Sequence, residues 1–106
     1  MVKKPINTEI MESIYKYIEE ISKHYKIEAI ILFGSYAKGT ENEDSDIDIA
    51  VISSDFEDII DEGAKLIGYT WNIDTRIEPH PITTEDYENV ATPFVQEVIN
   101  TGIKVA

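Results

Sequence analysis

Apolar residues recur along this chain first at helical spacing and then in a short continuous run. From residue 8 to about residue 24, apolar side chains three or four positions apart predict the buried face of a helix: Ile10, Ile14, Tyr17, Ile18 and Ile21. Asn7 or Thr8 can cap its start. Residues 27–33 are almost continuously apolar and rich in β-branched side chains, which predicts a buried strand that ends at Gly34.

A second strand is predicted after a short turn and an acidic loop. Residues 35–38 fit one helical turn, which Gly39 can close in the left-handed conformation. Residues 40–45 form a polar, acidic loop, and residues 46–53 form the next strand. The two strands therefore flank a turn and a loop within one short stretch of chain.

A longer helix is expected after the second strand. Asp55, with Asp58 three residues further on, is typical of a helix start. The helix is predicted to end near Asn72. Its apolar positions lie at helical spacing, and we expect them to face the core: Phe56, Ile59, Ile60, Ala64, Ile67 and Trp71.

The last part of the chain predicts a third strand and two short helices. Residues 73–80 alternate between apolar and polar side chains, and Pro79 and Pro81 are expected to stop that strand. Thr83 and Thr92 are N-cap residues of two helices, the second of which has these inward-facing residues: Phe94, Val95, Val98 and Ile99. The final four residues can add an edge strand. The order of elements predicts an α+β fold, a small mixed β-sheet flanked by helices.

Length and composition are those of an ordinary globular protein. The chain has 106 residues, of which 42% are hydrophobic and 28% charged, so we expect one domain over residues 1–106. No apolar stretch is long enough to span a bilayer, and residues 1–10 lack the apolar region of a signal peptide. The absence of cysteine excludes disulfides, thiolate zinc sites and a cysteine nucleophile. A cytoplasmic location is therefore the expectation.

The charge balance is strongly acidic. The chain carries 21 acidic and 9 basic residues, a formal net charge of −12. Such a surface repels phosphate backbones, which argues against long nucleic acid as a substrate. A single nucleotide remains compatible, because a bound divalent cation inverts the local field. The acidic surface also suits a basic protein partner, although solubility explains most of these carboxylates equally well.

Asp46 and Asp48 are the first candidate functional residues. Side chains alternate along a strand, so these two carboxylates project from the same face while Ile47 points into the protein. Two neighbouring carboxylates repel each other unless a cation lies between them. Aspartate is also a poor strand former, so secondary-structure propensity does not explain the pair. The pattern indicates a cation site.

Gly34 and Ser35 lie between a predicted strand and a helical turn, where backbone amides can approach a phosphate. A simple tight turn explains the same two residues equally well.

Gly34 and Gly39 match the start of a Walker P-loop, but Thr40 stands where the motif requires lysine, so that NTPase class is excluded. A calcium loop beginning at Asp44 fails in the same way, because Ile49 occupies its glycine position.

What remains is Gly-Ser, an intervening loop and Asp-x-Asp on a strand, and this combination resembles a known family. Gly34-Ser35 and Asp46-Ile47-Asp48, each with its apolar strand, look like the signature of the DNA polymerase beta-like nucleotidyltransferase superfamily. The sequence GSYAKGT…SDIDIAV and the short length of the chain are most similar to the minimal nucleotidyltransferase branch of this superfamily, which includes antitoxins. The helices and third strand also fit that fold.

The resemblance implies roles for these residues. Gly34 and Ser35 would hold the β- and γ-phosphates of a nucleoside triphosphate, and Lys38 is a further candidate phosphate contact. Asp46 and Asp48 would coordinate two Mg²⁺ ions, or Mn²⁺, because oxygen ligands suit these metals. The implied reaction is in-line attack of an acceptor hydroxyl on the α-phosphorus.

The family has a third carboxylate on a neighbouring strand, and two residues compete for that position. Glu78 fits the apolar–acid–apolar pattern best, and Asp74, four residues earlier on what we predict to be the same strand face, is the second choice. Arg76 should share the face of Glu78 and either neutralise phosphate or pair with a carboxylate. His80, between two prolines, is expected to be structural or exposed rather than in contact with substrate.

The leading functional hypothesis is therefore a Mg²⁺-dependent transferase that moves a nucleoside monophosphate, AMP from ATP in the first instance, to an acceptor hydroxyl. In small relatives the resemblance implies a partner protein of the HEPN class of helical ribonuclease toxins, with the transferase acting as antitoxin. One alternative is a binding module of the same fold that neutralises its partner by contact alone. Another is a small-molecule transferase of the antibiotic-modifying kind, which would need a homo-oligomer to form its acceptor pocket.

Overall fold

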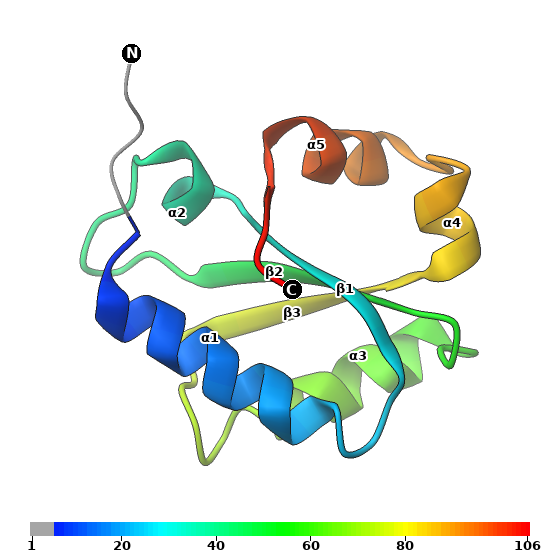
Figure 1. Cartoon of the computed structure of the whole chain (residues 1–106), viewed down its shortest axis with the longest axis horizontal. Helices are drawn as coiled ribbons and strands as arrows, with labels where there is room; N and C mark the ends of the chain where they lie inside the picture. The colour runs from blue at the N-terminus through cyan, green and yellow to red at the C-terminus, as the bar shows by residue number, and fades with distance from the viewer. Residues whose placement is uncertain (1–5) are drawn as a thin grey trace.

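The computed structural model describes residues 6–106, and their core is a four-stranded sheet with helices on both faces (Figure 1). In chain order the elements are α1 (Thr8–Ile21), β1 (Ile27–Phe33), α2 (Ser35–Lys38), β2 (Ile47–Ser53), α3 (Ile59–Gly68), β3 (Ile77–Thr83), α4 (Thr84–Glu88), α5 (Pro93–Thr101) and β4 (Ile103–Lys104). The strands are ordered β3-β2-β1-β4 across the sheet. β2 and β3 run parallel, whereas β1 pairs antiparallel with both β2 and β4. The predicted α+β class and mixed sheet are confirmed, as is the terminal edge strand.

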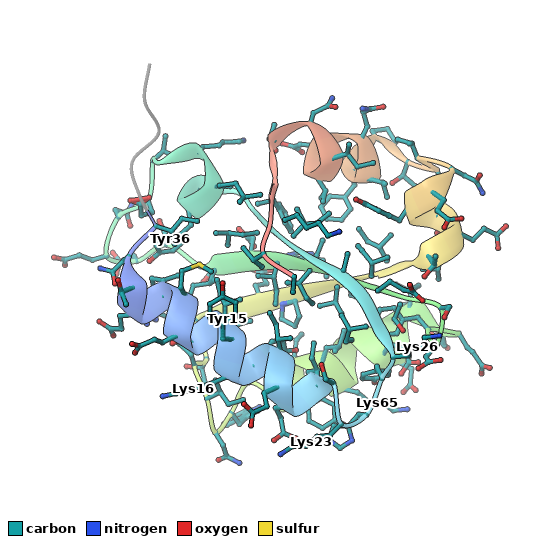
Figure 2. All side chains as sticks on the ribbon, viewed as in Figure 1. Tyr15, Lys16, Lys23, Lys26, Tyr36 and Lys65 are labelled. Atoms are coloured by element: carbon teal, nitrogen blue, oxygen red, sulfur yellow. The ribbon has the colours of Figure 1, made fainter. Side chains whose placement is uncertain are left out.

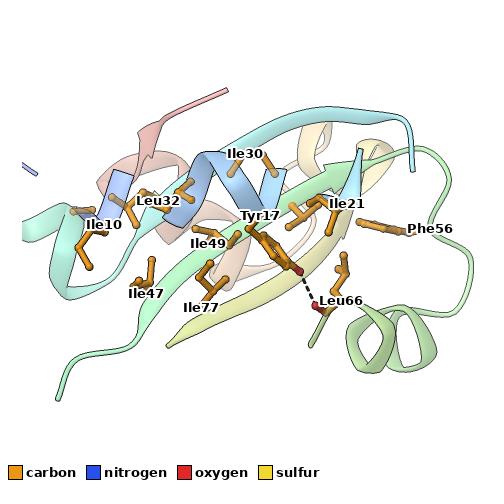
Figure 3. Close-up of a cluster of buried hydrophobic side chains, with 13 residues drawn as sticks. Ile10, Tyr17, Ile21, Ile30, Leu32, Ile47, Ile49, Phe56, Leu66 and Ile77 are labelled. Atoms are coloured by element: carbon orange, nitrogen blue, oxygen red, sulfur yellow. Dashed lines mark hydrogen bonds between the residues drawn. The ribbon is translucent and has the colours of Figure 1, made fainter. Parts of the chain in front are cut away.

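Alternation along the strands divides the core between the two faces of the sheet. One face packs against α1 and the segment around α3, and Figure 3 shows this larger cluster, which includes Ile10, Ile14, Tyr17, Ile21, Ile30, Leu32, Ile47, Ile49, Phe56, Leu66 and Ile77. The other face packs against α5 through a smaller cluster: Ala29, Ile31, Ala50, Ile52, Ile82, Val95 and Val98. Even-numbered residues of β2 and β3 therefore lie on the α5 face of the sheet, and odd-numbered residues on the α1 face.

Most of the predicted helix caps are confirmed. The Asn7 side chain accepts a hydrogen bond from the Glu9 amide, and Thr83 and Thr92 cap α4 and α5 in the same way. The start of α3 is one exception, because its cap is Asp58 and not Asp55. Asp55 instead accepts a hydrogen bond from the backbone amide that precedes β1. Helix α1 also ends at Ile21, three residues before the predicted boundary.

The rotation of α3 differs from the prediction. Most of the expected core stripe faces outward: Ile60 is 87% exposed, Ile67 52% and Trp71, in the turn after α3, 73%. Phe56, which precedes the helix, is buried as predicted. Two hydrogen bonds orient the opposite side of the helix toward the core. The Tyr17 hydroxyl donates to the Leu66 carbonyl oxygen at 2.7 Å (Figure 3), and the Tyr25 hydroxyl donates to the Glu62 carboxylate at 3.1 Å. In α5, Val95 and Val98 are buried as predicted, whereas Phe94 and Ile99 remain partly exposed.

The third strand starts later than predicted and continues through both prolines. β3 spans Ile77–Thr83, so residues 73–76 form a turn, and Pro79 and Pro81 lie within the strand. β3 is an edge strand that pairs only with β2 along its described length. Two prolines two positions apart direct their nitrogens to the same side, and at an edge the outer side requires no backbone donor. The prolines are therefore compatible with the ladder to β2.

Cationic side chains are scattered over the surface. Figure 2 labels Lys16 on α1, Lys23 just after α1, Lys26 just before β1 and Lys65 on α3, spread along the α1–α3 side of the molecule. Lys23 and Lys65 each pair with a neighbouring carboxylate.

Within residues 6–106, no helix is long and apolar enough to cross a membrane.

Candidate active site

The end of β1 and the starts of β2 and β3 lie together at one end of the sheet, and the candidate residues lie on or next to them. β1 ends at Phe33, which lies opposite Asp48 near the start of β2. β3 runs parallel to β2 with Glu78 opposite Asp48. Asp48, Glu78 and His80 are all even-numbered, so they lie on the sheet face that α5 partly covers. The parallel pairing of β2 and β3 thus places carboxylates from distant parts of the sequence side by side.

The side chains of Asp48, Glu78 and His80 form a compact cluster. One oxygen from each carboxylate and one imidazole nitrogen lie within 4.8 Å of one another. His80 Nε2 is 3.3 Å from Asp48 Oδ1 and 4.0 Å from Glu78 Oε1. The cluster is half-buried, since the Asp48 side chain is 25% exposed and that of Glu78 49%.

The pKa of Glu78 is affected by Asp46 as well as by Asp48. Partial burial raises the pKa of Glu78, and a hydrogen bond with the Asp46 carboxyl and the negative charge of Asp48 raise it further. Asp46 lies one residue before β2 and is exposed. The structure therefore places Asp48 and Glu78 side by side, with Asp46 close enough to Glu78 to affect its pKa.

The residues of the cluster fit a divalent cation. Carboxylate oxygens are the preferred ligands of Mg²⁺ and Mn²⁺, and imidazole nitrogen is an additional ligand for transition metals. Burial and the neighbouring Asp46 and Asp48 raise the pKa of Glu78, and a positive charge between these carboxylates would relieve their repulsion. The donor set and its spacing therefore support the cation site that the sequence indicated.

Gly34 forms the wall of the site behind Asp48. Its φ is +72°, in the region that favours glycine, and a Cβ atom at this position would lie 2.6 Å from Asp48 Oδ2. Ser35 begins α2 directly after it, and Gly39 closes that turn with φ +75°, as predicted. Lys38, at the end of α2, lies 3.7 Å from the carboxylate of Glu97 on α5. The Gly34-Ser35 turn is thus packed against the carboxylate cluster.

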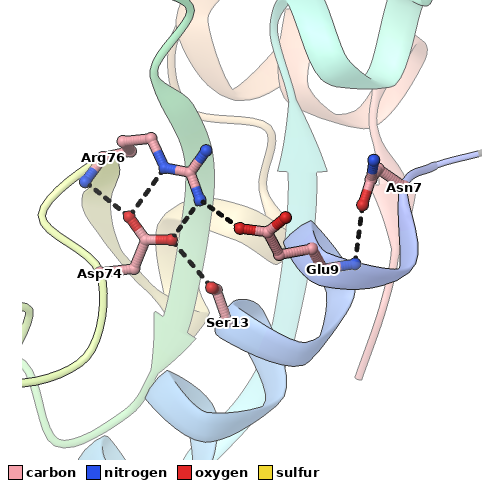
Figure 4. Close-up of polar contacts among 5 residues, drawn as sticks. All are labelled: Asn7, Glu9, Ser13, Asp74 and Arg76. Carbon is pink, nitrogen blue, oxygen red and sulfur yellow. Dashed lines mark hydrogen bonds and ion pairs between the residues drawn. The ribbon is translucent and has the colours of Figure 1, made fainter. Parts of the chain in front are cut away.

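Asp74 lies apart from the cluster, in the turn before β3 and against α1 (Figure 4). It accepts hydrogen bonds from Arg76 Nε at 3.0 Å, from Arg76 Nη2 at 2.7 Å and from the Ser13 hydroxyl at 2.8 Å. Arg76 also approaches Glu9 at 3.9 Å. The prediction that Asp74 and Arg76 share a strand face with Glu78 is wrong, because the chain turns at residues 73–76 before β3 begins.

Asp74 is expected to stabilise the fold in a pH-dependent way. Its hydrogen bonds with Arg76 lower its pKa to about 2 from an ordinary value of 3.8, and its side chain is only 9% exposed. A lowered pKa means that the carboxylate stabilises the folded state above about pH 4 and loses this contribution as the pH falls toward 2. At neutral pH, Asp74→Asn should lower the free energy of unfolding by about 2 kcal/mol.

Urea unfolding of wild type and Asp74→Asn at several pH values measures this contribution. The difference between the two proteins should be large at pH 7 and shrink as the pH approaches 2. Asp44→Asn, which changes an exposed carboxylate of the loop before β2, is the matched control and should behave like wild type. A pH-independent difference for Asp74→Asn would show that its ion pair is not the cause.

His80 is a member of the cluster that the sequence pattern did not predict. It is the last residue of the predicted strand over residues 73–80 and lies between the two prolines expected to stop that strand, so it was expected to be structural or exposed. In the structure, His80 and Glu78 both lie on β3 and on one face. A strand extended through the prolines would have predicted this position for His80.

Comparisons with known proteins agree with the fold and the motif. A family model described as "Polymerase beta, Nucleotidyltransferase" matches residues 16–106. "Putative protein adenylyltransferase MJ0141" from Methanocaldococcus jannaschii is 32% identical over 103 residues, covering 92% of this chain and 99% of that protein. "Protein adenylyltransferase MntA" from Shewanella oneidensis is 32% identical over 77 residues, which cover 73% of this chain and 52% of MntA.

A solved structure supports the same assignment. A chain from the "Crystal structure of the toxin-antitoxin with AMP-PNP" superposes with a TM-score of 0.59 and 26% identity, covering 91% of this chain and 72% of that one. The family model, the relative of nearly equal length and this fold all point the same way. The chain belongs to the polymerase beta-like nucleotidyltransferase family and resembles its minimal, MntA-type members.

Proposed function

We propose that this chain transfers a nucleoside monophosphate, AMP from ATP, to a hydroxyl group of a protein acceptor in the cytoplasm. The observation that carries the proposal is the carboxylate cluster of Asp46, Asp48 and Glu78 packed against the Gly34-Ser35 turn. A phosphate-binding turn beside a cation site is the arrangement that phosphoryl-group chemistry needs, because positioning and charge neutralisation supply most of its catalysis.

In this proposal each residue of the cluster has a defined task. Asp46, Asp48 and Glu78 hold two divalent cations, Mg²⁺ or Mn²⁺, and Gly34 and Ser35 contact the triphosphate from the adjoining turn. The bound cations would supply positive charge for the triphosphate and the leaving pyrophosphate. Lys38 lies on the same short helix and can exchange its exposed partner Glu97 for a phosphate oxygen.

The reaction requires a new bond between the acceptor oxygen and the α-phosphorus, with pyrophosphate leaving. The proton of the acceptor hydroxyl must be taken up as that bond forms. We assign this role to Glu78, because its side chain is more exposed than that of Asp48, 49% against 25%.

Three observations support a protein as the acceptor and partner. Two relatives are named as protein adenylyltransferases, and one similar structure is described as a toxin–antitoxin complex with AMP-PNP. The net charge of −12 disfavours long nucleic acid. The exposed apolar side chains of Ile60 and Ile67 on α3, with Trp71 in the turn that follows, are typical of a protein contact. We infer a helical partner of the HEPN toxin class, with basic residues that complement this acidic chain.

Label transfer tests the reaction class. The chain is incubated with Mg²⁺ or Mn²⁺, extract of its source cells, and ATP labelled at either the α- or the γ-phosphate. Transfer of the α-label alone to a protein band is the expected result, and the size of that band identifies the acceptor. Transfer of the γ-label would indicate a kinase and contradict the proposal. Tight capture of a partner without any label transfer would favour neutralisation by contact.

A further inference from the structure

We propose that His80 is a direct nitrogen ligand of the cation held by Asp48 and Glu78, and that it gives the site a preference for Mn²⁺ over Mg²⁺. The proposal rests on the proposed function only in requiring a cation between these two carboxylates. It differs from the oxygen-only ligand set expected from the sequence. It can be tested by metal binding, without any transfer reaction.

The distances within the cluster fit one shared cation. Ligand atoms about 2.1 Å from a metal lie about 3 Å apart when they are adjacent and about 4.2 Å apart when they are opposite. His80 Nε2 lies 3.3 Å from Asp48 Oδ1 and 4.0 Å from Glu78 Oε1. All three ligand atoms fall within 4.8 Å of one another, so a shared cation would have to draw the more distant atoms together by up to about 1 Å.

The surroundings of His80 hold the imidazole in this orientation. Its ring packs against Phe33 at 5.1 Å and Phe94 at 5.6 Å between ring centroids, and the two phenylalanines contact each other at 5.5 Å. The residue opposite His80 on β2 is the small Ala50. With its other side enclosed by aromatic rings, the imidazole presents Nε2 to the carboxylates.

The chemistry of the donor set leads to the predicted preference. Mg²⁺ selects oxygen ligands in near-ideal octahedral geometry, whereas imidazole nitrogen binds later divalent metals more strongly. A site with two carboxylates and one imidazole therefore favours Mn²⁺ over Mg²⁺ more than a site with carboxylates alone. His80 is thus proposed to determine metal specificity in the cluster.

Pulsed electron paramagnetic resonance of the Mn²⁺-loaded protein tests for the nitrogen ligand directly. The wild-type chain should show ¹⁴N coupling from a bound imidazole, and labelling the histidines with ¹⁵N should replace that coupling with a ¹⁵N signal. This arm requires no variant, so it does not depend on how a substitution folds. The chain has two histidines, and His24 lies stacked on Tyr69 beside Glu20, which makes His24→Asn a matched control.

His80→Asn should lose the nitrogen coupling and bind Mn²⁺ about 10-fold or more weakly, with a change of less than about 3-fold for Mg²⁺. His24→Asn should keep both the coupling and the affinity. Mn²⁺ bound without histidine coupling would overturn the proposal and leave His80 as a hydrogen-bond partner of Asp48, while the proposed function stands. Equal losses of Mn²⁺ and Mg²⁺ affinity in His80→Asn would also overturn it. A wild-type chain that binds neither metal would contradict both proposals.

Discussion

Asp46→Asn and Asp48→Asn are each expected to lose nucleotidyl transfer by about 100-fold or more, because each removes a charged ligand from the proposed cation site. Neither substitution should lower the thermal stability of the chain. The two carboxylates raise the pKa of Glu78, so they repel its ionised form in the metal-free protein. Replacing either one with a neutral amide of the same shape relieves that repulsion. The melting temperature should remain unchanged or rise.

Single-turnover transfer from α-labelled ATP and thermal melts of the same preparations measure both effects. Asp44→Asn is the matched control, because it removes an exposed carboxylate from the loop before β2 and should keep full activity. It has the same charge change as the two test variants. Full transfer by both Asp46→Asn and Asp48→Asn, at an unchanged melting temperature, is incompatible with a catalytic cation at this cluster.

Gly34→Ala is expected to reduce both stability and transfer. The backbone conformation of Gly34, with φ +72° and ψ −151°, costs a residue with a side chain about 1–3 kcal/mol. The new methyl group would also lie 2.6 Å from Asp48 Oδ2, so that the carboxylate or the turn must move. Because Asp48 is a proposed ligand, we expect a loss of transfer of about 10-fold or more at temperatures where the variant is folded.

Gly63→Ala provides the contrasting control for this prediction. Gly63 lies within α3, and a methyl group there would make only an ordinary contact, 3.8 Å from Pro81. Alanine is the better helix former, so this variant should gain up to about 1 kcal/mol and keep its activity. Transfer by folded Gly34→Ala at the wild-type rate would show that the position of Asp48 is not coupled to the turn.

The order of elements and the Asp-x-Asp pair could be predicted because they depend on local pattern. Alternation within one strand is enough to place Asp46 and Asp48 on one face, and the caps at Thr83 and Thr92 need only neighbouring residues. The pairing of Asp48 with Glu78 depends on contacts between distant segments. Its prediction came from the family resemblance and not from the pattern of residues alone.

Two predictions were wrong, the start of β3 and the rotation of α3, and residue spacing alone does not show the cause of either. Residues 73–80 alternate as a strand does, but Asp74 accepts hydrogen bonds from the backbone and side chain of Arg76 and so stabilises a turn. Because of that turn, β3 begins only at Ile77 and Asp74 lies outside the cluster. His80 lies within β3 and belongs to the cluster. For α3, spacing predicts an apolar face but does not say which face meets the core. Hydrogen bonds from Tyr17 and Tyr25 decide this.

The most direct test of the proposed site compares Glu78→Gln with Asp74→Asn in transfer of the α-label. The two residues were competing candidates for the same role, and only Glu78 lies in the cluster, whereas Asp74 is paired with Arg76. Glu78→Gln should lose transfer by about 30-fold or more while remaining at least as stable as wild type. Asp74→Asn should be less stable but transfer within about 3-fold of wild type where it is folded. Strong loss in Asp74→Asn, with full activity in Glu78→Gln, would contradict the assignment of this cluster as the catalytic centre.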